Sequence, residues 1–280
     1  MQVTATEKPG VDYLSVRNKL KTLDTILFRG SDLVSQTIIK IESRVDGTEA
    51  QFSHAAMVIE GKHLLPIVRE CEREWLRPDG LYIFESTMSG SLSDGVKDVE
   101  GRAHLCVQLR NMDQVIKAYD LNSPDTRIAW CPLKESIHST IQGPMFDVNV
   151  RAAYDRYLGL CYDASILDLG GAASPFIRWF RDNRFIKWMR DTCFSVFGTS
   201  RDIDGDSLPR DNRPSHWQFC SELCTNIYRD LGLVPQTCNP ENVMPQDMVP
   251  RENGKTTYDS DGQFPVIFDQ VVRIHAHKDQ

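Results

Sequence analysis

A cysteine stands at the predicted start of a helix late in the chain. Segment 218–224 (QFCSELC) leads into apolar residues at helical spacing, and Gly232 provides a stop. The unpaired backbone N–H groups and the dipole at a helix start favour a thiolate over a thiol. Cys220 is therefore a candidate nucleophile toward a carbonyl, with the backbone N–H groups of Cys220 and Ser221 as oxyanion donors. For this segment alone, a buried structural cysteine is the favoured alternative.

Two upstream residues have the chemistry to complete such a site. His54 opens the apolar segment 53–59 (SHAAMVI), and histidine is the usual base for a cysteine because its pKa lies near neutrality. Glu85 ends a predicted strand over residues 81–85, where a carboxylate can accept a hydrogen bond from a histidine and orient it. Taken singly, each has an ordinary alternative: a satisfied structural histidine and a solvent-facing glutamate.

Metal binding has weaker support in the sequence. His216, Cys220 and Cys224 are four residues apart, but no fourth ligand is near and the spacing matches no usual zinc pattern. Segment 202–206 (DIDGD) lacks the ligand alternation and the closing glutamate of a calcium loop. We therefore expect no metal site.

The elements that must position these residues follow from hydrophobic periodicity and turn residues. Strands are predicted at 23–28, 54–60, 81–85, 104–109, 127–131 and within 264–274. Helices are predicted at 32–41, 112–119, 147–158 and 220–231. Antiparallel strands surrounded by helices predict an α+β fold, in a single domain over residues 1–280.

Residues 164–215 differ from the rest and are predicted to be a helical insertion. Its aromatic and basic residues spread around a helical wheel instead of separating onto two faces. We expect it to pack its aromatic residues onto the core or a partner. The alternative is peripheral membrane contact through this segment.

Composition restricts the partners and the compartment. The chain has 280 residues, 41% of them hydrophobic, and a formal net charge of -7, so no nucleic-acid binding is expected. No apolar run reaches the roughly 18 residues of a membrane span, and residues 1–10 lack the apolar core of a signal peptide. Eight scattered cysteines without an export signal indicate reduced thiols. We expect a cytoplasmic protein that is not secreted by a classical signal.

Six segments, in this order, resemble the permuted papain-like cysteine hydrolases, the YiiX-type branch of the NlpC superfamily. In that branch the histidine strand comes first and the cysteine helix last. The segments are 23–30 (LDTILFRG), 53–59, 84–87 (FEST) followed by Gly95 and Val96, 157–163 (YLGLCYD), 219–223 (FCSEL) and 240–248. One departure is Leu23, which precedes Asp24 where the family usually has glycine.

The resemblance implies a circularly permuted papain-like (NlpC-type) fold with an antiparallel sheet packed with helices. It implies that Cys220 is the nucleophile, His54 the base and Glu85 the polar third member, without a metal or an organic cofactor. The implied reaction is hydrolysis or transfer at an amide or ester bond.

The implied substrate is a peptide, a peptidoglycan-like amide or a lipid acyl group, because the superfamily includes acyltransferases similar to lecithin:retinol acyltransferase. Two alternatives to a peptidase or amidase stay open: a lipid acyltransferase or phospholipase, and a non-catalytic structural or host-interaction protein. Related proteins occur in bacteria and in large DNA viruses, so packaging in a virion is an alternative to a cytoplasmic location.

Overall fold

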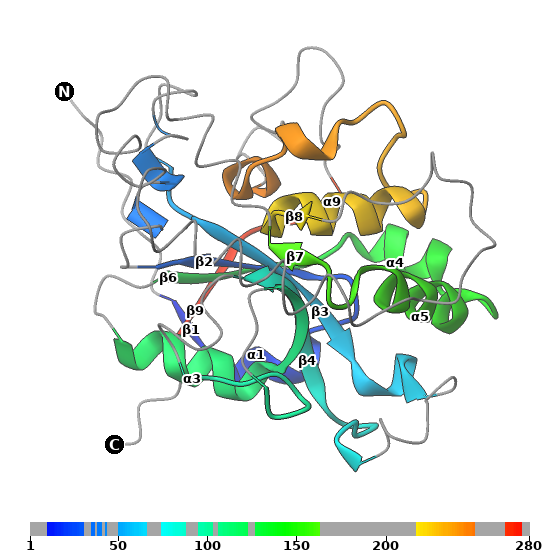
Figure 1. Cartoon of the computed structure of the whole chain (residues 1–280), viewed down its shortest axis with the longest axis horizontal. Helices are drawn as coiled ribbons and strands as arrows, with labels where there is room; N and C mark the ends of the chain where they lie inside the picture. Colours follow the sequence, from blue (N-terminus) through cyan, green and yellow to red (C-terminus); the bar gives the residue numbers. More distant parts are fainter. Residues whose placement is uncertain are drawn as a thin grey trace.

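The computed structural model describes residues 10–30, 35–36, 38–40, 43, 50–65, 74–87, 95–102, 106–122, 127–162, 217–249 and 267–275. In these residues a nine-stranded sheet carries helices on both faces, which makes the fold α+β (Figure 1). The order of strands across the sheet is β1-β9-β6-β2-β3-β4-β5-β7-β8.

The strands are β1 (Val11–Asp12), β2 (Thr25–Arg29), β3 (His54–Glu60), β4 (Leu81–Thr87), β5 (Cys106–Asn111), β6 (Arg127–Cys131), β7 (Cys161–Tyr162), β8 (Trp217–Gln218) and β9 (Val272–His275). The interior pairs are antiparallel, but β1 pairs with β9 and β7 with β8 in parallel. The expectation of an antiparallel sheet is therefore corrected at both edges. There the chain pairs segments that are far apart in sequence, which local patterning does not detect.

The helices are α1 (Tyr13–Val16), α3 (Met112–Asn122), α4 (Glu135–Ile141), α5 (Phe146–Tyr157) and α9 (Cys220–Asp230). Short 3₁₀ turns are η1 (Arg17–Lys19), η2 (Gly61–His63), η7 (Pro240–Asn242) and η8 (Pro245–Met248). Of the helix predicted at 32–41, residues 35–36 and 38–40 are helical. The predicted insertion at 164–215 lies outside the described residues.

Strand β3 is buried on both faces, which explains its unbroken apolar sequence. Ala55 and Met57 belong to the core that includes α5 and α9, whereas Ala56 and Val58 belong to the core that includes α1 and α3. The sheet therefore separates two hydrophobic cores, and β3 contributes to both.

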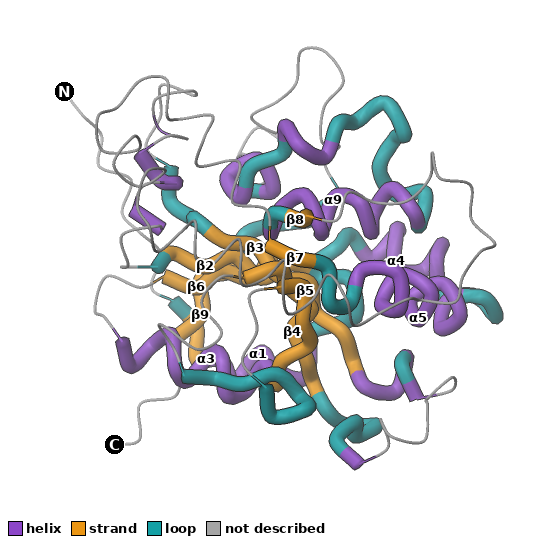
Figure 2. The backbone as a smooth tube through the Cα atoms, in the orientation of Figure 1, coloured by secondary structure: helices purple, strands orange, loops and turns teal. Residues whose placement is uncertain are grey.

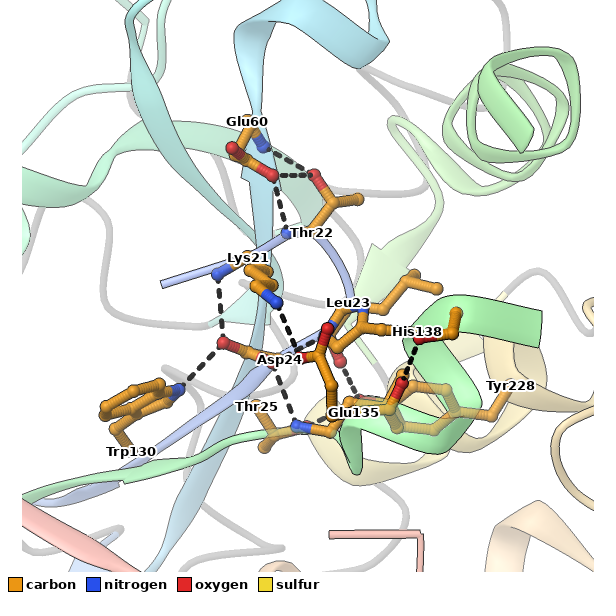
Figure 3. A network of polar contacts seen from close by, with 12 residues as sticks. Lys21, Thr22, Leu23, Asp24, Thr25, Glu60, Trp130, Glu135, His138 and Tyr228 are labelled. Carbon is orange, nitrogen blue, oxygen red and sulfur yellow. Dashed lines mark hydrogen bonds and ion pairs between the residues drawn. The ribbon is translucent and has the colours of Figure 1, made fainter. Parts of the chain in front are cut away.

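Asp24 is the centre of a buried polar network at the entrance to β2 (Figure 3). Its carboxylate accepts hydrogen bonds from the Lys21 and Leu133 backbone N–H groups at 2.9 Å each and from Trp130 Nε1 at 2.8 Å. His138 Nε2 lies 3.2 Å from the same carboxylate. A buried carboxylate needs such partners, so this network anchors β2 to β6 and to α4.

Leu23, just before Asp24, has a φ of 77°, in the left-handed region that favours glycine. Its side chain is buried and its backbone is held at both ends. Its N–H donates to the Val58 carbonyl at 2.9 Å, and its carbonyl accepts the Tyr228 hydroxyl at 2.7 Å. The two backbone hydrogen bonds thus hold a residue other than glycine in this conformation, and its side chain adds buried apolar surface.

Five cysteines in the described part of the chain are free and buried: Cys106, Cys131, Cys220, Cys224 and Cys238. None of the helices in the described residues is long and apolar enough to cross a membrane.

Candidate active site

Helix α9 begins at Cys220, directly after the short strand β8 (Figure 2). The Leu223 N–H donates to the Phe219 carbonyl at 2.9 Å as the first helical bond, and the Glu222 side chain accepts from the Phe219 N–H at 3.1 Å. The backbone N–H groups of Cys220 and Ser221, in the first turn, have no carbonyl partner within the helix. Cys220 is therefore at the electropositive end of a buried helix, as the sequence predicted.

His54 is the first residue of β3, and its side chain is 11% exposed. Phe28, its partner on β2, packs against the imidazole with ring centroids 5.8 Å apart. Nε2 of His54 lies 2.5 Å from Oε2 of Glu85, and the Cys220 side chain interacts electrostatically with the imidazole. Because Nε2 is engaged by Glu85, Nδ1 is the ring nitrogen left for the sulfur.

Strand pairing explains why His54 and Glu85 meet. Strands β3 and β4 are antiparallel with Met57 opposite Phe84, so the start of β3 and the end of β4 share one end of the sheet. Helix α9 packs against both strands and brings Cys220 to the same end. Three segments that are far apart in sequence thus place a thiol, an imidazole and a carboxylate in one connected line.

Glu85 differs from expectation in its surroundings. The strand continues to Thr87, so Glu85 lies within β4 and is fully buried, whereas a single strand-end glutamate favoured a solvent-facing position. Its second oxygen, Oε1, accepts from Nε of Arg110 at 2.6 Å. Arg110, on β5, is itself fully buried. Sequence reasoning missed Arg110, because the strand predicted at 104–109 ended just before it, whereas β5 continues to Asn111.

The electrostatics favour charged forms of the histidine and the carboxylate. Burial lowers the pKa of His54, but the Cys220 thiolate and the Glu85 carboxylate raise it, to about 10. Burial raises the pKa of Glu85, but the charge of Arg110 and then the hydrogen bond from His54 lower it, to about 2. An imidazolium beside a carboxylate is the charge arrangement that these shifts support.

Cys224 lies one helical turn after Cys220 and behaves differently. Burial raises the pKa of its thiol well above the ordinary value, and the negative charges of Cys220 and Glu85 raise it further. Cys224 therefore stays a thiol in the core, as expected from its place on the helix.

The segment that contains Val243 and Gln246, after α9, hydrogen bonds with residues next to both Cys220 and His54. The Ser221 hydroxyl donates to the Val243 carbonyl at 2.6 Å, and the Gln51 N–H donates to Oε1 of Gln246 at 2.8 Å. Val243 and Gln246 lie at the turns η7 and η8, so one loop is attached to the start of α9 and to the residues preceding β3. Such attachments limit relative movement of Cys220 and His54.

The described residues contain only part of one of the two metal patterns, Cys220 and Cys224. No group of three or more histidine, cysteine or acidic side chains there is arranged to hold a metal ion. His216 and segment 202–206 lie outside the described residues.

The arrangement is suited to nucleophilic attack by sulfur followed by proton transfer from the imidazole. No protein-family model matches this chain, and no curated protein matches it.

Proposed function

We propose that this chain is a cysteine hydrolase with a permuted papain-like (NlpC-type) fold, which cleaves an amide or ester bond through an acyl-enzyme. The observation that carries the proposal is the connected line Cys220–His54–Glu85, in which the histidine hydrogen bonds with Glu85 and interacts electrostatically with Cys220. The α+β fold and the order of the three segments along the chain support the same conclusion.

The proposed reaction follows from the protonation states. The Cys220 thiolate attacks the carbonyl carbon, and the backbone N–H groups of Cys220 and Ser221 hold the oxyanion. The His54 imidazolium donates its proton to the leaving nitrogen or oxygen as the bond to carbon breaks, which leaves a thioester. A water molecule then attacks the thioester while His54 takes the proton of that water. The C–S bond breaks, the acid product leaves, and the thiolate–imidazolium pair is restored.

The proposed substrates are a peptide, a peptidoglycan-like amide or a lipid acyl group. In each, the reacting atom is a carbonyl carbon, and the acceptor is water in hydrolysis or an alcohol or amine in acyl transfer. The single domain, with its proposed helical insertion at 164–215, supplies all three side chains.

The first test is whether Cys220 carries an activated thiolate. We expect ultraviolet thiolate absorbance that is lost in Cys220→Ala and is present well below the ordinary cysteine pKa of about 8.5. This readout is chosen because Cys220 is buried, so a labelling rate would also depend on reagent access. His54→Ala should abolish the low-pH absorbance. His63→Ala is the matched control, because His63 also contacts carboxylates but lies away from Cys220.

The second test is acyl transfer to the sulfur. Incubation with aryl esters, peptide amides and acyl lipids, followed by mass spectrometry, should reveal a thioester on Cys220 with at least one of these classes. A Cys220 that titrates as an ordinary thiol, or whose titration is unchanged in His54→Ala, would refute the proposal. An activated thiolate that none of the acyl donors modifies would favour the non-catalytic alternative.

A further inference from the structure

Arg110 binds Glu85, the third member of the proposed triad. Its Nε donates to Oε1 of Glu85 at 2.6 Å, and its Nη1 donates to the Val96 carbonyl at 3.3 Å. Val96 follows Gly95, whose φ of 69° lies in the left-handed region that favours glycine. The loop at Gly95 and Val96 therefore offers the guanidinium a backbone acceptor in addition to Glu85.

The two oxygens of Glu85 are divided between two partners. Oε1 is bound by Arg110 and Oε2 by His54. Because each oxygen is held, rotation of the carboxylate away from His54 would break both contacts. The sheet register makes this possible: Arg110 lies opposite Ile83 on β4, so it reaches Glu85 along the diagonal between neighbouring strands.

The charges that face Glu85 are few. Among the described residues they are His54 on β3 and Arg110 on β5, and the uncharged Cys224 thiol on α9 also faces the carboxylate. Of these, only the guanidinium is positively charged at every accessible pH, since the charge of His54 itself depends on Glu85. Burial by itself would favour the protonated form of a carboxyl group in this position.

We propose, resting on the hydrolase function above, that Arg110 is a positioning residue. Its charge and hydrogen bonds keep Glu85 a carboxylate aimed at His54, so that His54 can take the Cys220 proton at mildly acidic pH. If the Glu85–Arg110 ion pair served stability alone, apolar side chains could replace it with little or no loss of folding stability, because burying two charges costs free energy. In this site the ion pair keeps Glu85 a carboxylate beside His54, which an apolar pair cannot do.

The test is the pH titration of the Cys220 thiolate, measured as the absorbance difference from Cys220→Ala. In Arg110→Met we expect the midpoint to rise by about one pH unit or more, which means about tenfold less thiolate at a given acidic pH. Arg110→Lys restores the charge without the forked geometry and should return part of the shift. Arg151→Met is the matched control, because Arg151 is also buried and ion-paired but sits on α5 with Asp155.

A double variant keeps the test informative if Arg110→Met folds poorly. Glu85→Gln with Arg110→Met removes both charges together and so leaves no uncompensated buried charge. If Arg110 acts through Glu85, the double variant should titrate like Glu85→Gln alone. A further shift in the double variant, or an Arg110→Met curve that overlays the native one, would overturn the proposal. Both outcomes are distinct from failure of the hydrolase function, in which the native Cys220 shows no low-pH thiolate at all.

Discussion

Replacing Asp24 with asparagine tests whether the buried carboxylate network holds the fold. The carboxylate accepts at Oδ2 from Lys21 N and Trp130 Nε1 and at Oδ1 from Leu133 N, with His138 beside Oδ1. An amide in the same place has one accepting oxygen and one donating NH₂ group. If the NH₂ group replaces Oδ2, it meets two donors. If it replaces Oδ1, it meets the Leu133 N–H, although His138 can change tautomer and accept.

The size of the destabilisation follows from the more favourable of the two amide orientations. At least one buried donor loses its acceptor, at about 1–3 kcal/mol, and the remaining hydrogen bonds lose the contribution of the negative charge. We therefore expect Asp24→Asn to lower the free energy of unfolding by about 2–4 kcal/mol. Because these contacts do not involve Cys220, His54 or Glu85, the thiolate titration of the folded variant should match that of the native protein.

Urea unfolding followed by circular dichroism measures this loss, and Asp113→Asn provides the comparison. Asp113 accepts from the Tyr13 hydroxyl and from Arg17, but its side chain is 41% exposed, so water replaces lost contacts. The expected loss there is under about 1 kcal/mol. If Asp24→Asn costs no more than Asp113→Asn, the argument from buried unsatisfied donors is wrong.

Two further predictions concern a histidine and a glycine. His63 lies between Glu60 and Asp147; burial lowers its pKa, but the two carboxylates raise it more, so the folded pKa exceeds the unfolded value. Its contribution to stability is therefore complete below about pH 6.5 and is lost as pH rises through the folded pKa, so His63→Gln should destabilise more at acidic than at alkaline pH in urea unfolding. A loss that grows with pH would contradict this assignment. Gly232, with a φ of 71° and no atom within 4 Å of an added Cβ, should lose about 1 kcal/mol in Gly232→Ala, while the equally open Gly143, which has no positive φ, should lose little. Equal losses at the two glycines would show that backbone conformation is not the cause.

Local patterning predicted several elements to within a few residues. Strands β3 and β6 have the predicted bounds, and α9 starts at Cys220 and ends before Gly232 as predicted. These elements depend on apolar periodicity and on stop residues, which are properties of neighbours in the chain. The expected single domain and the insertion at 164–215 stay predictions.

The surroundings of Glu85 show where local patterning ends. A strand predicted to stop at Glu85 continues to Thr87, because β4 pairs with β5 as far as Cys106. That pairing buries Glu85 and brings Arg110 to it, and neither residue carries a local sign of the other. The parallel edge pairs β1–β9 and β7–β8 arise in the same way, from contacts between distant segments.

The residue types of the site and their local settings follow from the sequence: a cysteine at a helix start, and a histidine at the start of an apolar strand. These settings depend on periods of two and of 3.6 residues and on helix-start chemistry, all of which act over a few residues. Only the tertiary structure decides which charges share a buried space. Strand register places Arg110 diagonally across from Glu85, packing of α9 brings Cys220 to His54, and burial makes each charge depend on its neighbour.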